Sequence, residues 1–317
     1  MNEYLQDPHQ VKLAGSLYSA MADKINKNEL PNSKSTPNQV QLCNAGKSDY
    51  ARIARFLNKD ILAHRHLDWK SALDWLGDSP YLYEAKEDEI TALLCCTPEN
   101  TDSAWVRAFA SVRNGPYKTS WHSLLTGAVK VLRKKSIKKL VSLALQEWFE
   151  VLLIESGFTT TQSIVVLEWM GILPPLGEEN PNITIRPMFE RDLPFVQQVD
   201  AAAFPPLWQT SLAGLRKALH HSTHSTIALL DKQIAAYQIS TSLGNSAHLA
   251  RLAVSPKYQK LHIAYSLVGE LLKCFDEQGI WRLTVNTQSD NQPSLNLYNK
   301  IGFKRSGESI RVYALNL

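Results

Sequence analysis

The chain has 317 residues, of which 44% are hydrophobic and 20% charged, and its formal net charge is +4. This length and composition fit an ordinary globular protein of roughly two domains. No apolar run approaches the ~20 residues that a membrane-spanning helix needs. The first residues show no basic stretch followed by an apolar one. We therefore expect neither a membrane protein nor a secretory signal.

The charge is uneven along the chain. From residue 183 onward there are 14 Lys and Arg against 9 Asp and Glu, whereas the preceding residues hold 20 against 21. A mildly basic C-terminal half suits a small anionic ligand. It lacks the clustered basic face that nucleic-acid binding usually requires, so no nucleic-acid partner is expected.

The cysteines and histidines form no metal-binding pattern, so no metal site is expected. No CxxC pair occurs among the four cysteines, which are Cys43, Cys95, Cys96 and Cys274. The adjacent Cys95 and Cys96 lie in an apolar run typical of core thiols, and a reducing cytoplasm is the simplest setting for them. Three histidines in a Ser/Thr-rich stretch are expected to be solvated loop residues, namely His220, His221 and His224.

Two breaks divide the sequence. Residues 1–38 are a polar N-terminal arm, with a short helix expected from about residue 8 to 23. Residues 173–182 hold three prolines and a glycine without periodicity and are predicted to be a linker. The remaining parts, 39–172 and 183–317, are predicted to be two domains.

The two parts resemble each other in layout. Each begins with a short strand, an acidic residue and an amphipathic helix, in residues 40–59 and 183–202. Each also has a late helix ending in Gly-Phe, at Gly157 and Gly302, at nearly the same distance from the first strand. We interpret them as two copies of one α/β unit. The alternative is a chance similarity of two α/β domains, since few identities align.

The order of elements predicts the fold class, α/β (α+β). Strands in the second copy are expected at 183–187, 226–230, 234–242, 247–254, 281–286 and about 309–315. Only the strand–helix–strand stretch from 247 to 286 requires a parallel crossover. Each copy is therefore predicted to be a mostly antiparallel mixed sheet flanked by helices. Alternation along the fourth strand places one set of side chains, Leu249, Arg251 and Ala253, on the face opposite Ala250, Leu252 and Val254.

A basic turn after this strand suits an anion. Ser255-Pro256 ends the strand, because proline cannot donate to the ladder. Lys257 to Ala264 then turns into an amphipathic helix, for which Gly279 is the expected C-cap. The first N–H groups of a helix lack intrahelical partners and carry partial positive charge, so they bind phosphate without side chains. The alternative is an ordinary solvated helix start.

A helix carrying a tyrosine follows the next strand. Asn291 is the expected cap and Pro293 lies in the first turn. Tyr298 lies about two turns into the helix, and Gly302 ends it. The alternative to a chemical role is that Tyr298 only packs, with its hydroxyl at the surface.

Together these two motifs resemble the cofactor-binding half of the GNAT N-acetyltransferases. The family pattern Gln/Arg-x-x-Gly-x-Gly/Ala corresponds to Gln259-Lys-Leu-His262-Ile-Ala264, with His262 in place of the central glycine. The pattern Asn-x-x-Ala/Ser-x-x-x-Tyr-x-x-x-Gly-Phe corresponds to Asn291 through Gly302-Phe303. The resemblance covers 183–317, and 39–172 more weakly. Glycine at the position of His262 would let phosphate approach closely, so His262 either preserves binding or weakens it.

The resemblance implies acetyl-CoA as co-substrate and a set of contact residues. In the family, the tyrosine protonates the departing thiolate, so Tyr298 is the implied acid. The backbones of Leu252 and Val254 would pair with the pantetheine arm, Asn291 would contact that arm, and one amide would bind the thioester oxygen. The implied cofactor-binding residues are Leu252, Ala253, Val254, Gln259, Lys260, Leu261, His262, Ile263, Ala264, Asn291 and Tyr298.

The general base and the acceptor are less evident. His248 either removes a proton from an ammonium substrate through water or is a surface histidine at a strand end. The loop Phe204-Pro-Pro-Leu-Trp208 is expected to shape the acceptor pocket, since a similar Phe-Pro-x-x-Trp loop occurs in relatives that acetylate protein N-termini. In the first copy Leu153 stands where the tyrosine is expected, and the phosphate turn is missing. That copy is therefore predicted to be degenerate.

The predicted function is acetyl transfer from acetyl-CoA to a primary amine of a small molecule, a protein N-terminus or a lysine. The alternative is a non-catalytic CoA-binding or interaction protein on a degenerate acetyltransferase fold. An enzyme that uses a longer acyl-CoA is a third possibility. A monomer and a homodimer are equally compatible with the sequence.

Overall fold

A computed structural model describes residues 40–173 and 182–317. The predicted N-terminal arm with its helix, and nearly all of the predicted linker, lie outside the described residues. The chain divides into two compact units. Among the described residues, the first comprises 40–97 together with Val106–Lys135, and the second comprises Pro98–Trp105 with 136–173 and 182–317.

The first unit is an antiparallel sheet with a long helix. Its strands are β1 (Gln41–Asn44), β2 (Ile61–Arg65), β3 (Tyr81–Lys86), β4 (Glu89–Pro98) and most of β5 (Ser103–Val112). Its α-helices are α2 (Tyr50–Leu57) and α3 (Tyr117–Lys134). Ile53 and Phe56 of α2 are buried in one cluster with Trp75, Tyr81 and Leu93. The apolar stripe of α2 therefore covers the strands, as its periodicity predicts.

The second unit holds the rest of the fold. Its strands are β6 (Lys139–Ala144), β7 (Thr159–Trp169), β8 (Ile183–Pro187), β9 (His224–Leu230), β10 (Gln233–Leu243), β11 (Ser246–Val254), β12 (Arg282–Gln288) and β13 (Lys304–Asn316). Its α-helices are α4 (Glu147–Glu155), α5 (Leu193–Ala203), α6 (Leu212–His221), α7 (Ile263–Glu277) and α8 (Gln292–Ile301). The strand order is β6-β13-β7-β12-β11-β10-β9-β8. Between neighbours in this order only β11 and β12 run parallel, which confirms the predicted mixed sheet.

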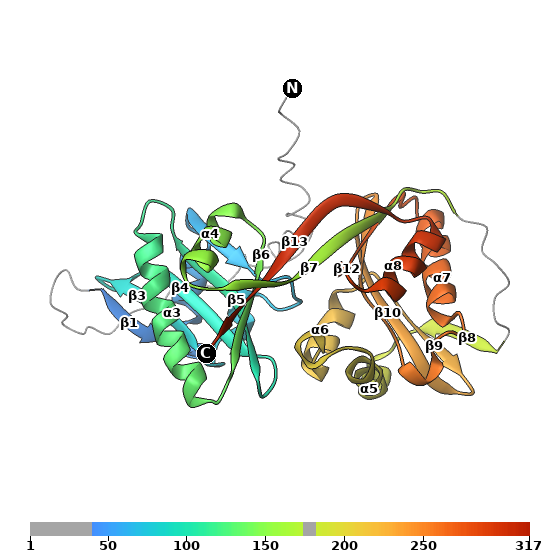
Figure 1. Cartoon of the computed structure of the whole chain (residues 1–317), viewed down its shortest axis with the longest axis horizontal. Helices are drawn as coiled ribbons and strands as arrows, with labels where there is room; N and C mark the ends of the chain where they lie inside the picture. The colour runs from blue at the N-terminus through green and yellow to red at the C-terminus, as the bar shows by residue number, and fades with distance from the viewer. Residues whose placement is uncertain (1–39, 174–181) are drawn as a thin grey trace, which may run out of the picture. The chain divides into compact units, whose positions relative to one another are not determined.

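The two copies of the repeat exchange their last strands. β7, from the first copy, pairs with β12 of the second, and β13 pairs with β6 of the first. β7 and β13 also pair with each other, as their side-by-side course in Figure 1 illustrates. Residues 136–169, assigned by sequence to the first copy, therefore lie in the same compact unit as the second copy. The domain boundary between 172 and 183 remains a prediction about the repeat.

Helices α5 and α7 cover opposite faces of the sheet. Ala236 of β10 lies in one apolar cluster with Ile263 and Leu267 of α7. The next residue, Tyr237, donates a hydrogen bond to Asp200 of α5. Because consecutive side chains of a strand point to opposite faces, α7 lies on one face and α5 on the other.

The alternation predicted for the fourth strand is wrong at Leu249. In the pairing of β10 with β11, Ile239 is opposite Arg251 and Ser240 is opposite Leu249, so Ala250 forms a β-bulge. The extra residue shifts the alternation by one. Leu249 therefore lies in the same cluster as Leu252, on the α7 face, and Arg251 points to α5.

Two other expectations need correction. His220 and His221 are the last residues of α6, and His224 is the first residue of β9, so none of them lies in a loop. His220 is exposed, as expected, whereas His221 and His224 are partly buried. The sixth strand begins at Lys304 rather than near 309. By contrast, Cys95 and Cys96 are fully buried, as predicted for core thiols.

Candidate functional site

The central strands of the second copy separate beside the bulge. β11 pairs with β12 only from Ser246–Leu249, opposite Arg282–Val285. Beyond that point β11 continues along β10 to Val254, and β12 continues along β7 to Gln288. Within the described strands, the β12 side of the last residues of β11 is left without a ladder partner. An extended ligand can pair with that edge.

Near the end of β11, every second residue points its backbone N–H into this opening. The N–H of Ser255 donates to the carbonyl of Ala235 on β10, one residue beyond the last β10–β11 pair of Ala236 and Val254. Because N–H groups alternate sides along a strand, those of Leu252 and Val254 point away from β10 and into the opening. Ala253 is buried and points its N–H toward β10.

The turn that leads into α7 has a strained backbone. Lys260 and His262 both have φ of 63°, in the left-handed region. Such a conformation is costly for a residue with a Cβ and free for glycine. His262 is the N-cap of α7 and accepts the helix bond from the N–H of Ser266 at 3.0 Å. His262 therefore adopts a backbone conformation that glycine would adopt without strain.

Most side chains of the turn are exposed and do not compete for its backbone groups. Gln259, Lys260, Leu261 and His262 are exposed, and Ala264 is partly buried. Ile263 is only 2% exposed and packs against the sheet, so it can offer a ligand its backbone alone. The free helix N-terminus and the neighbouring lysine make this turn electropositive.

Tyr298 lies on the α7 side of the opening. Its side chain is 4% exposed and shares a cluster with Leu249 and, at the edge, Leu252. Its ring centroid is 5.4 Å from that of Phe303. Burial raises the pKa of Tyr298 well above its usual value, so the hydroxyl is protonated at neutral pH and can donate. Asn291 caps the same helix through a 3.2 Å bond from the N–H of Ser294, as predicted.

His248 approaches from the other face. Ala247 and Leu249 point to the α7 face, so His248 between them points toward the α5 face. Its Nδ1 is 2.9 Å from the hydroxyl of Thr284, which donates its proton to the carbonyl of Ala247 at 3.3 Å. That hydroxyl can therefore only accept from His248, which makes Nδ1 the protonated nitrogen. Burial lowers the pKa of His248 to about 4, so the ring is neutral at pH 7, with Nε2 as its acceptor.

A buried polar cluster supports the predicted acceptor loop. Arg251 donates from Nε to Asp200 at 2.5 Å and to the Tyr237 hydroxyl at 3.0 Å. Its other end donates to the carbonyl of Trp208 at 2.7 Å. Its guanidinium lies 4.0 Å from the ring centre of Phe204. One arginine thus holds both ends of the loop between α5 and α6.

Sequence reasoning missed this cluster, although a signal was present. Asp200 lies on the buried stripe of α5 beside Val196 and Val199. A carboxylate on an apolar helix face is rare unless it is paired. The loop itself packs against Trp105 of β5, whose indole nitrogen donates to the carbonyl of Leu207 at 3.3 Å.

The position in the first copy that corresponds to Tyr298 holds a leucine. Leu153 of α4, where the tyrosine was expected, is fully buried. Across the described ranges 40–173 and 182–317, no three His, Cys, Asp or Glu side chains are grouped as metal ligands. No helix of those ranges is long and apolar enough to span a bilayer.

Residues 193–303 match the model of the acetyltransferase (GNAT) family. A tandem GNAT protein from the clavulanic acid biosynthesis pathway superposes with a TM-score of 0.61 at 12% identity, over 88% of this chain and 98% of that one. A GCN5-related N-acetyltransferase from Sphaerobacter thermophilus has a TM-score of 0.56 at 14% identity, over 89% of this chain and 97% of that one. One from Kribbella flavida has a TM-score of 0.59 at 10% identity, over 88% and 71%. No curated protein matches the chain.

Proposed function

Because residues 193–303 carry a domain of the GNAT acetyltransferase family, we propose that the second copy transfers an acetyl group from acetyl-CoA to a primary amine. The observation that carries this proposal is the opening between β11 and β12. Leu252, at the unpaired edge of β11, shares apolar clusters with Tyr298 and with Ile263 at the start of α7. Acetyl-CoA would match these features with its thioester beside the phenol, its pantetheine arm along the strand edge and its pyrophosphate at the helix N-terminus.

Donor binding relies mainly on the backbone. The N–H groups at the start of α7 would hold the pyrophosphate, with the exposed Lys260 adding charge. Leu252 and Val254 would pair with the amides of the pantetheine arm. The N–H of one of them would polarise the thioester carbonyl. The positive φ of His262 supports this role, because the backbone has the shape that close approach of a phosphate needs.

The reaction forms one C–N bond and breaks one C–S bond. The neutral amine attacks the thioester carbon, and the thiolate leaves with a proton donated by Tyr298. The tyrosinate that remains regains a proton from solvent. The raised pKa of Tyr298 keeps that proton available at neutral pH. The excess proton on the amine leaves through water toward Nε2 of His248. Since the pKa of His248 is about 4, it passes the proton on to solvent rather than storing it.

The acceptor would enter from the α5 face. The loop Phe204–Trp208 borders that side, and Arg251 fixes both of its ends. A rigid aromatic wall of this kind suits a specific amine, such as a protein N-terminus or a small-molecule amine, rather than any exposed lysine.

Two measurements on the full chain test the proposal. Calorimetric titration with acetyl-CoA and with CoA should show binding of both. Incubation with acetyl-CoA and a panel of primary amines, followed by mass spectrometry, should yield an acetylated amine. Binding without turnover of any amine would favour the non-catalytic CoA-binding role, and turnover only with longer acyl-CoA donors would favour a different acyl group. No binding of either ligand would overturn all of these functions.

A further inference from the structure

A second group of reactive side chains lies on α7, away from the proposed donor site. Cys274 is in the fourth turn of α7, about 16 Å along the axis from Ile263 at its start. Its sulfur lies 3.6 Å from Nδ1 of His224, the first residue of β9. Nε2 of the same ring lies 3.0 and 3.1 Å from the two carboxylate oxygens of Glu270. Thiol, imidazole and carboxylate thus form a continuous line.

Buried hydrogen bonds fix the direction of this line. Ser240 donates to Oε1 of Gln238 at 2.7 Å, and Nε2 of Gln238 donates to the hydroxyl of Thr226 at 3.1 Å. That hydroxyl therefore uses its own proton on Glu270, at 3.4 Å. The carboxylate can only accept, so His224 must donate to it from Nε2. Nδ1 is then left as the acceptor that faces the thiol.

The imidazole is held in place by packing as well. The side chain of His224 is 17% exposed, and its ring meets the ring of Phe275 edge-on at 5.8 Å. A nucleophile, a base and a residue that orients the base are the components of an activated thiol. Without a base, the thiol of Cys274 would be a poor nucleophile, because little of it would be thiolate at neutral pH. Burial raises the pKa of Cys274, and the carboxylates of Glu270 and Glu277 raise it further, against a bond from Gln278 at 3.1 Å.

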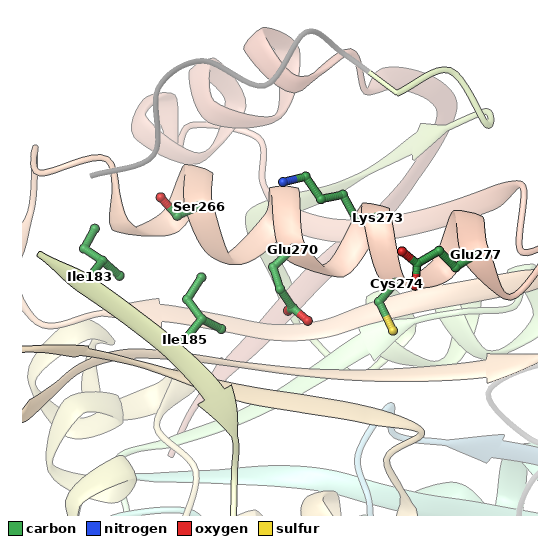
Figure 2. Close-up of a pocket in the computed structure, with 7 residues that line it drawn as sticks. All are labelled: Ile183, Ile185, Ser266, Glu270, Lys273, Cys274 and Glu277. Carbon is green, nitrogen blue, oxygen red and sulfur yellow. The ribbon is translucent and has the colours of Figure 1, made fainter. Parts of the chain in front are cut away.

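A cavity of about 460 Å³ opens beside the thiol. Figure 2 shows Glu270 and Cys274 along one side of α7, with Ile183 and Ile185 of β8 facing them. The charged side chains of its lining are two carboxylates, Glu270 and Glu277, and one ammonium, Lys273. The lining therefore favours a small ligand with positive charge and some apolar surface.

Attack on a carbonyl is disfavoured at this position. Cys274 lies in the interior of α7, where backbone N–H groups are used by the helix. The N–H groups of α7 on either side of Cys274 are therefore not available to hold an oxyanion. Thiol–disulfide exchange has no such need, because its transition state spreads charge over sulfur atoms.

We propose that Cys274, His224 and Glu270 form a site at which a cationic low-molecular-weight disulfide reacts with the protein thiol. His224 takes the thiol proton at Nδ1, and the Cys274 thiolate attacks one sulfur of the disulfide. The disulfide's S–S bond breaks as the new bond to Cys274 forms. The departing thiolate takes the proton back from the imidazolium. The products are a mixed disulfide on Cys274 and one free small thiol, and the small disulfide is the oxidant.

The test uses the full chain and intact-mass measurement. Of the four cysteines, Cys95 and Cys96 are buried, so Cys43 is the comparison thiol. Wild type, Cys43→Ser and Cys274→Ser are treated at pH 7 with cystamine, which is cationic, and with 3,3′-dithiodipropionate, which is anionic. We expect Cys274 to react with cystamine at least tenfold faster than Cys43. The ratio of the rate with cystamine to the rate with 3,3′-dithiodipropionate should be higher at Cys274 than for a free cysteine derivative. At Cys43 this ratio should match that of the free derivative.

Substitutions then separate activation from exposure. His224→Asn in the Cys43→Ser background should slow the reaction at pH 7 about tenfold or more. It should also make the rate follow the titration of an unassisted thiol. Glu277→Gln should reduce the preference for cystamine while the dependence on His224 persists. Equal rates at Cys274 and Cys43, or a pH profile unchanged by His224→Asn, would overturn the proposal. If His224→Asn does not fold, Glu270→Gln with the same pH profile decides the question.

Discussion

Arg251 donates a hydrogen bond from Nε to Oδ2 of Asp200 at 2.5 Å, and this pair joins β11 to α5 beside the strand opening. The side chain of Asp200 is fully buried and that of Arg251 is 15% exposed. Asp200 also accepts from the N–H of Thr210 at 2.7 Å. The pair therefore connects the bulged strand, the first helix of the copy and the loop predicted to receive the amine.

Replacing Asp200 by Asn should be strongly destabilising, because it leaves the guanidinium of Arg251 buried without a counter-charge. Breaking such a pair costs about 3–5 kcal/mol of the free energy of unfolding, as measured by urea denaturation. The matched control is Glu190→Gln, which removes an exposed partner of Arg216 and should cost at most about 1 kcal/mol. In whatever fraction folds, the KM for the amine should rise more than the KM for acetyl-CoA. An unchanged KM for the amine would contradict the role given to the loop.

Tyr298→Phe should lower kcat about 100-fold and leave the Kd for acetyl-CoA nearly unchanged, because the hydroxyl acts only as the thiolate departs. Tyr313→Phe is the matched control, since it removes a buried hydroxyl that donates to Glu150 at 2.6 Å on β13. Steady-state kinetics and calorimetry give both quantities. Equal losses of kcat in the two variants would show that Tyr298 is a packing residue.

His262→Gly should stabilise the folded chain by about 1 kcal/mol, because glycine adopts a φ of 63° without strain. It should also tighten acetyl-CoA binding, because glycine has no Cβ to crowd an approaching phosphate. His262→Ala keeps the strain and removes only the imidazole. If alanine weakens binding, the imidazole itself contacts phosphate. If glycine binds acetyl-CoA no more tightly than alanine does, the Cβ at this position does not hinder the phosphate. Calorimetric titration with acetyl-CoA distinguishes these outcomes.

His248 should make stability depend on pH. Its folded pKa of about 4 lies below the usual value near 6.5, so the unfolded chain binds the proton more tightly than the folded one. The contribution is fully present above about pH 6.5 and is lost as the pH falls toward 4, with a limit of about 3 kcal/mol. His248→Asn keeps a donor for Thr284 but does not titrate. The difference in free energy of unfolding between the two proteins should therefore change between pH 7.5 and pH 5.

Local features of the fold could be predicted from the sequence because they depend on residues a few positions apart. The cap at Asn291, the left-handed end at Gly302 and the apolar stripe of α7 all follow from side chains within one or two helical turns. The turn before α7 belongs to the same group. The sequence predicts a turn between Ser255-Pro256 and α7 from neighbouring residues. The structure adds that His262 adopts the positive φ that glycine favours.

Other features were decided by the tertiary structure. The bulge at Ala250 shifts the face of Leu249, and no single strand sequence reveals such a shift, because it arises from the pairing with β10. The exchange of β7 and β13 depends on which of several similar strands offers a free edge. His224 gave no local signal, since its partners Glu270 and Cys274 are far away in the chain.

The sequence alone therefore predicted helix ends such as Asn291 and Gly302, and it led to the proposal of an anion site and a catalytic phenol. It could not determine the partners of the buried polar groups. Asp200 needs Arg251 and Tyr237, and His248 needs Thr284. Burial makes each of these hydrogen bonds obligatory, and only the packed sheet brings the partners within reach.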